Sequence, residues 1–438
     1  MRFLGIGESC DLNSLYKSLI EAGHEVRVHI GEQMCHGVMA GIVRRVDSWQ
    51  EHLDWVREAG PDGIILFESV AGQSGALQDR LRADGLNVIG GSAFGDRLEN
   101  DRTFGQEIMA GFGMRTARSW GFDDAAAAVS HIEANPGRYV LKFSGVEDFA
   151  AGDNYVGRMV DGRDVAAMVQ ARMRQRDGKP TRFILMDHVE GVEMGVGAYF
   201  NGHDFLEPAC LDWEHKRFFP GDLGELTGEM GTVATYCGTK SFFEATLARV
   251  APLLREHGYL GYININTIVN AEGIWPLEFT CRFGYPGFAV LAPLQRTGWA
   301  QLFRSMVTRS STRFETHDGY SVGIVMTTRP FPFTRAWVPE ELGLPVLFDG
   351  APTEADIANL HWGEMALDPS GQPVTAGFHG WTMVVTGLGD TVTEAQKAAV
   401  SLADRIVIPD VRYRRDIGDK LISGQLDTLR ALGLYDGR

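Results

Sequence analysis

The sequence predicts a multi-domain protein of mixed α/β and α+β class whose N-terminal part is a doubly wound parallel sheet. Three observations support this prediction. The chain has 438 residues, enough for roughly two to four domains of ordinary size. Short apolar runs alternate with amphipathic ones over the N-terminal part, as in consecutive βαβ units. Near the C-terminus, two apolar runs and one amphipathic run favour a smaller α+β domain.

The N-terminal part reads as alternating strands and helices. We expect strands at RFLGIG, EVRVHI, GIILFE and NVIGG, and helices at residues 11–22, 48–58 and 74–83. The first turn, GIGESC, has two glycines of the dinucleotide fingerprint GxGxxG but none where the helix must pack closely. A nicotinamide cofactor is therefore disfavoured.

The middle of the chain has a different pattern. A helix at 103–111 and the strand YVLKFS at 139–144 precede a long polar loop, GVEDFAAGDNYVG, at 145–157. A helix at 163–175 and the strands FILMDHV and GVGAYF follow the loop. Because the loop is too long for a hairpin turn, we expect either a structured lid or a plain flexible loop.

Past Lys240 the pattern predicts a helix through His257 and then two strands, GYININTIV and IWPLEFT, joined by the turn NAEG. The strands YSVGIVMTT and WTMVVTGLG and a helix at 393–405 make up the expected C-terminal domain.

The charge balance disfavours two classes of partner. The chain has 57 acidic and 41 basic residues, a net charge of −16, whereas nucleic acids and anionic membranes are bound mainly through Lys and Arg. Five scattered cysteines without a CxxC pair indicate a reducing cytoplasm. We find no signal-peptide pattern and no run of eighteen apolar residues, so neither export nor membrane anchoring is expected.

Five separated segments carry the residue types that phosphoryl transfer needs. They are Lys142, Glu193, EHKRF at 214–218, GDLGELTGEMG at 221–231, and the opening stretch. These segments supply cations for phosphates, carboxylates for a divalent metal, and glycine-containing loops whose amides can approach anions. No P-loop GxxxxGK[ST] is present. An ATP site in this chain must therefore be built from strands and loops.

Several of these motifs together resemble one known family. EHKR followed by GDLGELTGEMG, then PLEFTCRFGYPG, then PVTAGFHGWTMVVTGLGDTVTEAQ with RRDIG after it, resemble the phosphoribosylamine-glycine ligase (glycinamide ribonucleotide synthetase) family of the ATP-grasp superfamily. The matches run from about residue 60 to about residue 420, in the family's order and spacing.

The resemblance implies an ATP-grasp fold in three domains. These are an N-terminal α/β domain at 1–100, an ATP-grasp core at 101–317 with a flexible B subdomain at about 115–188, and a C-terminal α+β domain at 318–438. The implied partners are ATP, Mg²⁺ or Mn²⁺, a small carboxylic acid such as an amino acid, and an amine that can be nucleotide-like. The implied state is a monomer or homodimer.

The implied chemistry is amide formation. ATP phosphorylates the carboxylate, and the amine then displaces phosphate from the acyl phosphate. By position in the motifs, Arg102 and Lys142 would bind ATP phosphates. Asp187 and Val189 lie in MDHVEGVEMG, the segment that would cup adenine and ribose, and Glu193 would accept from the ribose hydroxyls. The alternative for Arg102 and Glu193 is an ordinary surface charge.

The resemblance also assigns the catalytic and metal residues. Lys216 and Arg282 would be catalytic, with Arg282 near the transferred phosphate or the acid substrate, and Glu278 would bind the metal. Thr280 stands where the family has an asparagine ligand, and Asn266 on the preceding strand could compensate. The alternative for Asn266 is ordinary hydrogen bonding within a sheet.

Departures from the family concentrate where the substrates should bind. Leu226, Glu229 and Tyr285 replace family residues of the acid pocket, and Arg217 adjoins them. GESCDLNSLY replaces the family's phosphoribosyl-binding turn. These changes favour a divergent paralogue with new substrates over a genuine phosphoribosylamine-glycine ligase of purine synthesis. A non-catalytic nucleotide-binding paralogue is a further alternative, suggested by Thr280 and by a lid loop without lysine.

Overall fold

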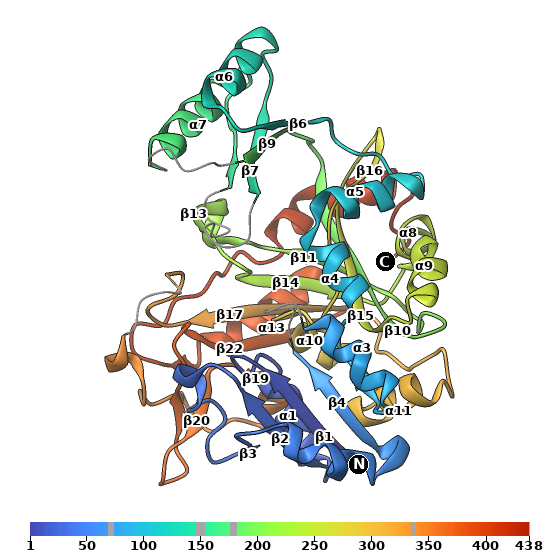
Figure 1. Ribbon diagram of the computed structural model, residues 1–438. Coiled ribbons are helices and arrows are strands. Elements are labelled where there is room, and N and C mark those ends of the chain that lie inside the picture. The colour runs from blue at the N-terminus through green and yellow to red at the C-terminus, as the bar shows by residue number, and fades with distance from the viewer. Residues whose placement is uncertain (69–73, 145–153, 176–181, 334–337, 438) are drawn as a thin grey trace.

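The computed structural model describes residues 1–68, 74–144, 154–175, 182–333 and 338–437. Most of the loop that was expected to be a lid, residues 145–153, lies outside this range, as do residues 69–73 of the segment FESVAGQSG. The chain folds into an N-terminal sheet, a projecting lobe with its own sheet, and a large central sheet (Figure 1).

The N-terminal sheet is parallel, as predicted, with the strand order β3-β2-β1-β4-β5. This order reverses beside β1, and in open parallel sheets ligands bind at such a switch point, outside the carboxyl ends of the strands. Glu8 and Glu68 directly follow the two strands at this point. The elements are β1 Arg2–Gly7, α1 Asn13–Glu21, β2 Glu25–Ile30, β3 Arg44–Arg45, α2 Leu53–Arg57, β4 Gly63–Phe67, α3 Gly75–Ala83 and β5 Val88–Ile89.

A small lobe projects from the rest of the molecule at the top of Figure 1. It has a four-stranded sheet of order β6-β9-β7-β8, and its own apolar core joins Leu141 and Phe183 of the sheet to Ile132 and Val165 of the helices. Its elements are β6 Ser119–Phe122, α6 Ala125–Ala134, β7 Tyr139–Ser144, β8 Tyr155–Val156, α7 Arg163–Gln175 and β9 Arg182–Asp187. The boundaries predicted for the B subdomain stay a prediction.

The central sheet has eight strands in the order β16-β15-β10-β11-β14-β17-β22-β19, all antiparallel to their neighbours. It therefore continues without a break across residue 318, where we placed a domain boundary, and that boundary stays a prediction. The strands are β10 Val192–Asn201, β11 Cys210–Glu214, β14 Gly231–Thr235, β15 Leu260–Asn270, β16 Gly273–Thr280, β17 Tyr320–Thr327, β19 Leu360–Trp362 and β22 Trp381–Gly389.

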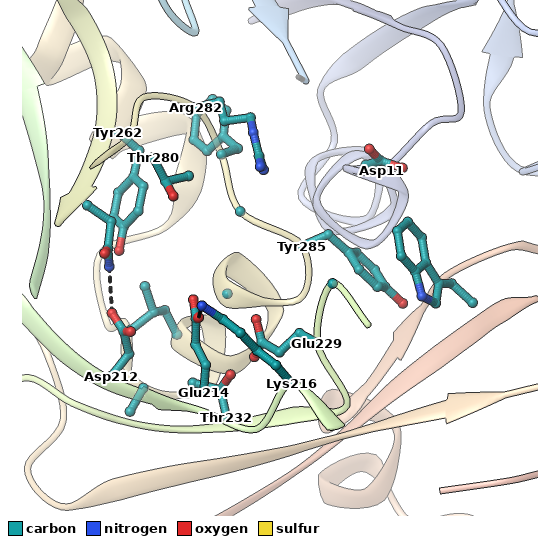
Figure 2. Close-up of a pocket in the computed structure, with 18 of the residues that line it drawn as sticks. Asp11, Asp212, Glu214, Lys216, Glu229, Thr232, Tyr262, Thr280, Arg282 and Tyr285 are labelled. Carbon is teal, nitrogen blue, oxygen red and sulfur yellow. Dashed lines mark hydrogen bonds and ion pairs between the residues drawn. The ribbon is translucent and has the colours of Figure 1, made fainter. Parts of the chain in front are cut away.

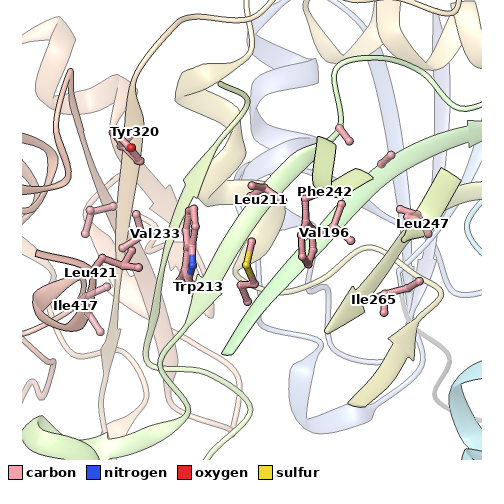
Figure 3. Close-up of a cluster of buried hydrophobic side chains, with 14 of the residues drawn as sticks. Val196, Leu211, Trp213, Val233, Phe242, Leu247, Ile265, Tyr320, Ile417 and Leu421 are labelled. Atoms are coloured by element: carbon pink, nitrogen blue, oxygen red, sulfur yellow. The ribbon is translucent and has the colours of Figure 1, made fainter. Parts of the chain in front are cut away.

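One face of the central sheet is apolar. Val196, Leu211, Trp213, Val233 and Ile265 come from four strands and pack in one buried cluster (Figure 3). Each of these residues alternates along its strand with a polar residue or glycine, as a strand with one buried face requires. The opposite face is therefore free to carry polar side chains.

The helix expected from Lys240 through His257 is interrupted. It forms two shorter helices, α8 Lys240–Ala245 and α9 Ala251–Glu256, joined by a short 3₁₀ turn. Thr246 leaves helical geometry at φ −128° and ψ −97°, and Pro252 lies in the first turn of the second helix, where the missing N–H of proline is tolerated.

The remaining elements connect or cover the sheets. They are α4 Ala93–Asn100, α5 Arg102–Gly111, β12 Arg217–Phe219, β13 Leu223–Leu226, α10 Gly287–Leu291, α11 Trp299–Thr308, β18 Leu347–Phe348, α12 Glu354–Ala358, β20 Met365–Leu367, β21 Pro373–Thr375, α13 Val392–Ala403, β23 Ile406–Val407 and α14 Leu426–Ala431. Within the described ranges, every helix is too short or too polar to cross a bilayer. All five cysteines are free thiols.

The C-terminal segment packs on the central sheet through Leu421, which is 2% exposed, whereas its neighbour Ile422 is 43% exposed. We expect Leu421→Ala to lower the free energy of unfolding by about 2–5 kcal/mol, because it leaves a cavity in the core. Ile422→Ala should change it by only about 0.5 kcal/mol. Urea unfolding of the two variants checks this, and equal shifts of the midpoint would contradict the packing.

Candidate active site

The polar face of the central sheet gathers side chains from four strands. Residues directly opposite each other in an antiparallel pair share a face. Gly195 on β10 lies opposite both Asp212 on β11 and Asn266 on β15, and Asn266 in turn lies opposite Glu278 on β16. The alternation that buries one face of these strands therefore brings amides and carboxylates together on the other.

Two glycines on β10 let side chains meet across that strand. A Cβ at Gly195 would lie 2.2 Å from Asp212 Oδ1, and one at Gly197 would lie 1.8 Å from the Tyr262 hydroxyl. In the space that these glycines leave, Asn264 donates to Asp212 Oδ2 over 2.7 Å. Larger residues at these two positions would push the polar groups apart.

Lys216 is the cation at the centre of this face. Its Nζ lies 3.0 Å from Glu214, 3.3 Å from Glu193 and 3.7 Å from Glu278, and its side chain is only 24% exposed. Burial alone would lower the pKa of Lys216, but the three carboxylates outweigh it and hold the pKa well above its ordinary value. The ammonium is therefore charged at neutral pH. It contacts carboxylates from three strands, β10, β11 and β16.

Glu278 is surrounded by positive charge. Its carboxylate lies 3.4 Å from Arg102 as well as 3.7 Å from Lys216. Burial alone would raise the pKa of Glu278, but the charges of Lys216 and Arg102, with smaller contributions from Lys142 and Arg282, hold it below its ordinary value. Glu278 is therefore ionised at neutral pH.

The residues at this point suit a hard divalent cation. Glu278, Glu193 and Glu214 present carboxylate oxygens around a single positive charge, and Mg²⁺ prefers such ligands. Asn266 donates its Nδ2 to Glu193 over 3.0 Å, which leaves its Oδ1 to face a cation. Thr280 lies two pairs further along, opposite Asn264.

A cavity of about 420 Å³ opens beside this cluster, and we call it the main cavity. Glu214, Lys216 and Glu229 line it from the β11 and β14 side, Thr280 and Arg282 from the end of β16, and Asp11 from the N-terminal domain. Figure 2 shows the labelled side chains arranged around this space, with Asp11 and Tyr285 on the side away from Asp212.

Two predicted substrate residues line the main cavity. Glu229 is 7% exposed, and burial, then Glu214 and Asp212, raise its pKa well above the ordinary value. Tyr285 stacks on Trp381 with ring centroids 5.2 Å apart, and burial raises the pKa of its hydroxyl. Burial and the charge of Glu214 also raise the pKa of Asp212, to about 7.

Arg282 lines the same cavity, and its side chain is held by a carboxylate that does not line the cavity. Its Nε donates to Glu99 Oε1 over 3.0 Å, while Glu99 Oε2 accepts from the Cys281 N–H over 2.8 Å. One carboxylate on α4 therefore holds both the arginine and the backbone that carries it.

Lys142 and Arg102 line a second cavity of about 250 Å³, the lobe cavity, together with Met186 and Leu277. It lies between α5, the lobe sheet and β16. Burial, and then the charge of Arg102, lower the pKa of Lys142 to about 8. The structure therefore brings the two predicted phosphate cations together beside an apolar wall.

The other residues predicted for the nucleotide lie around this cavity rather than in its wall. Asp187 ends β9 and accepts from Arg118 Nε over 2.7 Å. Val189 is half-buried in the connection from β9 to β10. Glu193, on β10, belongs to the cluster around Lys216.

Leu226 and Arg217 are not brought together with Glu229. They line a third cavity of about 410 Å³ with Tyr155 and Arg158 of the lobe. Strand β13 pairs with β12, and Arg217 lies opposite Leu226 in that hairpin. The pairing places Leu226 against the lobe and not in the main cavity with Tyr285, so the predicted grouping of these residues is corrected.

Several residues of the site were not singled out from the sequence. Asp212 alternates with Glu214 and with the predicted catalytic residue Lys216 in CLDWEHK, and this period of two could have shown that the three residues share a face. Asp11 follows β1 at the switch point of the N-terminal sheet, which is also a sequence-level signal. For Trp381, more than a hundred residues after β14, the sequence holds no comparable signal.

Comparison with known families agrees with this architecture. A model of the phosphoribosylglycinamide synthetase ATP-grasp (A) domain matches residues 100–288. The phosphoribosylamine-glycine ligase of Neisseria meningitidis serogroup B is 26% identical over 387 residues, which cover 85% of this chain and 88% of that protein.

Solved structures show the same fold. The crystal structure of phosphoribosylamine-glycine ligase from Thermotoga maritima covers 95% of this chain and 100% of its own, with a TM-score of 0.71 at 20% identity. The biotin carboxylase domain of Hydrogenobacter thermophilus 2-oxoglutarate carboxylase, in complex with MgADP and bicarbonate, covers 99% of this chain and 95% of its own, with a TM-score of 0.63 at 12% identity. Residues 100–288 therefore match the ATP-grasp (A) domain of phosphoribosylglycinamide synthetase, and the chain as a whole is similar to phosphoribosylamine-glycine ligases and shares their fold.

Proposed function

We propose that this protein is an ATP-dependent, ADP-forming carboxylate–amine ligase whose substrate pocket differs from that of its relatives. The observation that carries the proposal is the convergence of four cations, Lys216, Arg102, Lys142 and Arg282, on the single ionised carboxylate of Glu278. Such a set matches a triphosphate and a divalent cation bound together, because phosphoryl transfer depends mainly on positioning and on neutralising charge.

In the proposed reaction, a carboxylate oxygen of the acid attacks the γ-phosphorus of ATP, and ADP leaves. The nitrogen of the amine then attacks the acyl carbon, phosphate leaves, and one proton of the nitrogen passes to a base. Arg282 and Lys216 face the space where this charge develops and would stabilise it.

The lobe cavity is the proposed site for the nucleotide. Lys142 and Arg102 would hold the phosphates, with adenine against Met186 and the β9–β10 connection, where Asp187 and Val189 lie. Glu193 would accept from the ribose hydroxyls, in exchange for its contact with Lys216.

Mg²⁺ or Mn²⁺ is the proposed metal, held by Glu278 with Asn266 as a neutral oxygen ligand and Thr280 nearby. A divalent cation supplies neutralisation of phosphate charge when it is bound. The residues of the chain orient it: Lys216 keeps Glu278 ionised, and β15 and β16 hold Asn266 and Glu278 opposite each other.

The main cavity is the proposed site for the acid and the amine, with Glu229 and Tyr285 in its wall and Arg217 and Leu226 outside it. The unusual residues Glu229 and Tyr285 favour a paralogue with new substrates over phosphoribosylamine-glycine ligation in purine synthesis. A non-catalytic nucleotide-binding paralogue is less favoured, because Glu278 is ionised and surrounded by cations. We also propose that the protein is a cytoplasmic monomer or homodimer.

The proposed activity is tested by incubating the protein with ATP, Mg²⁺ and panels of amino acids and amines, and by measuring ADP and phosphate. We expect ADP formation that requires both an acid and an amine, with glycine a poor acid. Formation of AMP, or no turnover of ATP with any pair, would contradict the proposal. A clear preference for glycine with phosphoribosylamine would favour the genuine ligase of purine synthesis.

The metal assignment predicts the effect of Glu278→Gln. The substitution removes a negative charge that a divalent cation needs, and a metal contributes several kcal/mol to such reactions, so kcat should fall at least about a hundredfold. The control is Glu272→Gln, because Glu272 lies in the exposed turn between β15 and β16 and pairs only at the surface, with Arg115. ADP formation at several Mg²⁺ concentrations is the measurement, and unchanged activity in the first variant would refute the assignment.

The pKa of Lys142 predicts a pH dependence. Its pKa of about 8 lies below the ordinary value, so the side chain is charged below pH 8 and loses its charge as the pH rises above it. We expect kcat/KM for ATP to fall about tenfold per pH unit well above pH 8, because a neutral amine binds phosphate weakly. In Lys142→Arg, whose guanidinium stays charged, the fall should move to higher pH. The same profile in both proteins would show that another group titrates.

A further inference from the structure

We propose that the amine substrate of this ligase carries a second positive charge, as a diamine or a basic amino acid does, and that it binds between Asp11 and Glu229 in the main cavity. The inference rests on the proposed function and names the substrate class that the cavity can accept. It also disfavours a phosphorylated sugar amine, which would bring negative charge to the same place.

The walls of the main cavity carry more carboxyl groups than cations. Six carboxylates line it, and only two cations, Lys216 and Arg282. Both cations are already paired, Lys216 with Glu214 and Glu278 of the same wall, and Arg282 with Glu99. No ion pair among the described residues involves the four other lining carboxylates, which are Glu8, Asp11, Asp212 and Glu229.

One of these carboxylates shows directly that a partner is missing. Glu229 is 7% exposed, and its Oε1 makes no hydrogen bond within the described structure. Leaving a buried polar group without a partner is costly, and more so for a charged one. Figure 2 shows the Glu229 side chain among those that surround the cavity, so an ammonium in the cavity is the simplest partner for its carboxyl group.

Three other unpartnered polar atoms belong to residues of the same wall. They are Thr232 Oγ1, the Tyr285 hydroxyl and Trp381 Nε1, each buried without a hydrogen bond within the described structure. Buried polar groups in native proteins are generally bonded. Their concentration around one cavity therefore points to a polar ligand and not to an apolar one.

The two ends of the cavity divide the substrates by charge. A carboxylic acid is anionic and is drawn to Arg282 and Lys216, where its oxygen meets the phosphates. The wall away from Asp212, formed by Asp11 and Tyr285 (Figure 2), is left for the amine. Because that wall offers the Asp11 carboxyl group and the Tyr285 hydroxyl to the cavity, it suits an ammonium group.

The N-terminal domain is unsuited to a phosphate at this point. The backbone N–H of Asp11, which precedes α1, already donates to Glu68 Oε2 over 2.7 Å. That amide is one a phosphate would need, and its hydrogen bond to Glu68 already occupies it. Glu8, from the end of β1, adds a further negative charge to the cavity wall.

The aromatic side of the cavity is held in place by a buried carboxylate. Glu364 accepts from the backbone N–H groups of His379 over 3.2 Å and of Gly380 over 2.7 Å. These bonds fix the turn that begins β22 and carries Trp381, which stacks on Tyr285. The wall is therefore preorganised for its ligand.

The test measures binding by isothermal titration calorimetry on the full-length protein, alone and with MgADP. Putrescine and L-lysine are the cationic probes and separate a diamine from a basic amino acid, and ribose 5-phosphate is the anionic probe. We expect one cationic probe to bind, and Glu229→Gln and Asp11→Asn each to weaken it at least about tenfold, because each removes a carboxyl group that can ionise and pair with the bound ammonium. The matched control Asp54→Asn, at an exposed carboxylate on α2 that pairs with Arg57, should bind as the wild type does.

The outcomes separate this inference from the proposed ligase activity. Binding of ribose 5-phosphate but neither cationic probe, or cationic binding that neither cavity variant weakens, would overturn the inference whether or not ADP forms in the ligase assay. Cationic binding that both variants weaken would support it, even if no acid yields ADP and the ligase proposal fails. Absence of binding by all three probes, with and without MgADP, would also overturn it.

Discussion

The contact of Lys216 with three carboxylates is the interaction on which the rest of the site depends. Glu193, Glu214 and Glu278 come from three strands of the central sheet, and each would repel the others if the ammonium were absent. A buried ion pair that loses one partner leaves an uncompensated charge, which is strongly destabilising. The same cation keeps Glu278 ionised, so one residue serves both the stability of the sheet face and its chemistry.

One face of the central sheet contributes to stability, and the other carries the candidate active site. The apolar face packs Val196, Leu211 and Ile265 into the core, and this burial offsets the cost of gathering charge on the other face. The switch point of the N-terminal sheet lies beside the polar face of the central sheet, because Asp11 lines the main cavity. The two sheets and the loop after β16 together enclose one reaction space, which no single domain provides.

The sequence predicted local features well and distant ones poorly. The N-terminal parallel sheet was predicted, because it follows from periodicity. Lys216 and Glu278 were each predicted as site residues, but their contact was not, because it joins two separate motifs. The interrupted helix after Lys240 and the place of Leu226 were not predicted, because a single non-helical residue decides the first and a hairpin register the second. The contact of Tyr285 with Trp381 depends on tertiary structure and has no local pattern.

The central claim is that an acyl phosphate forms in the main cavity on the way to an amide. Its most direct test uses an acid labelled with ¹⁸O in its carboxylate, incubated with ATP, Mg²⁺ and the amine. Mass spectrometry of the released phosphate then reads the origin of its oxygens. The account predicts that one ¹⁸O appears in the phosphate for each amide formed. Unlabelled phosphate accompanying amide formation, or label in AMP, would contradict it.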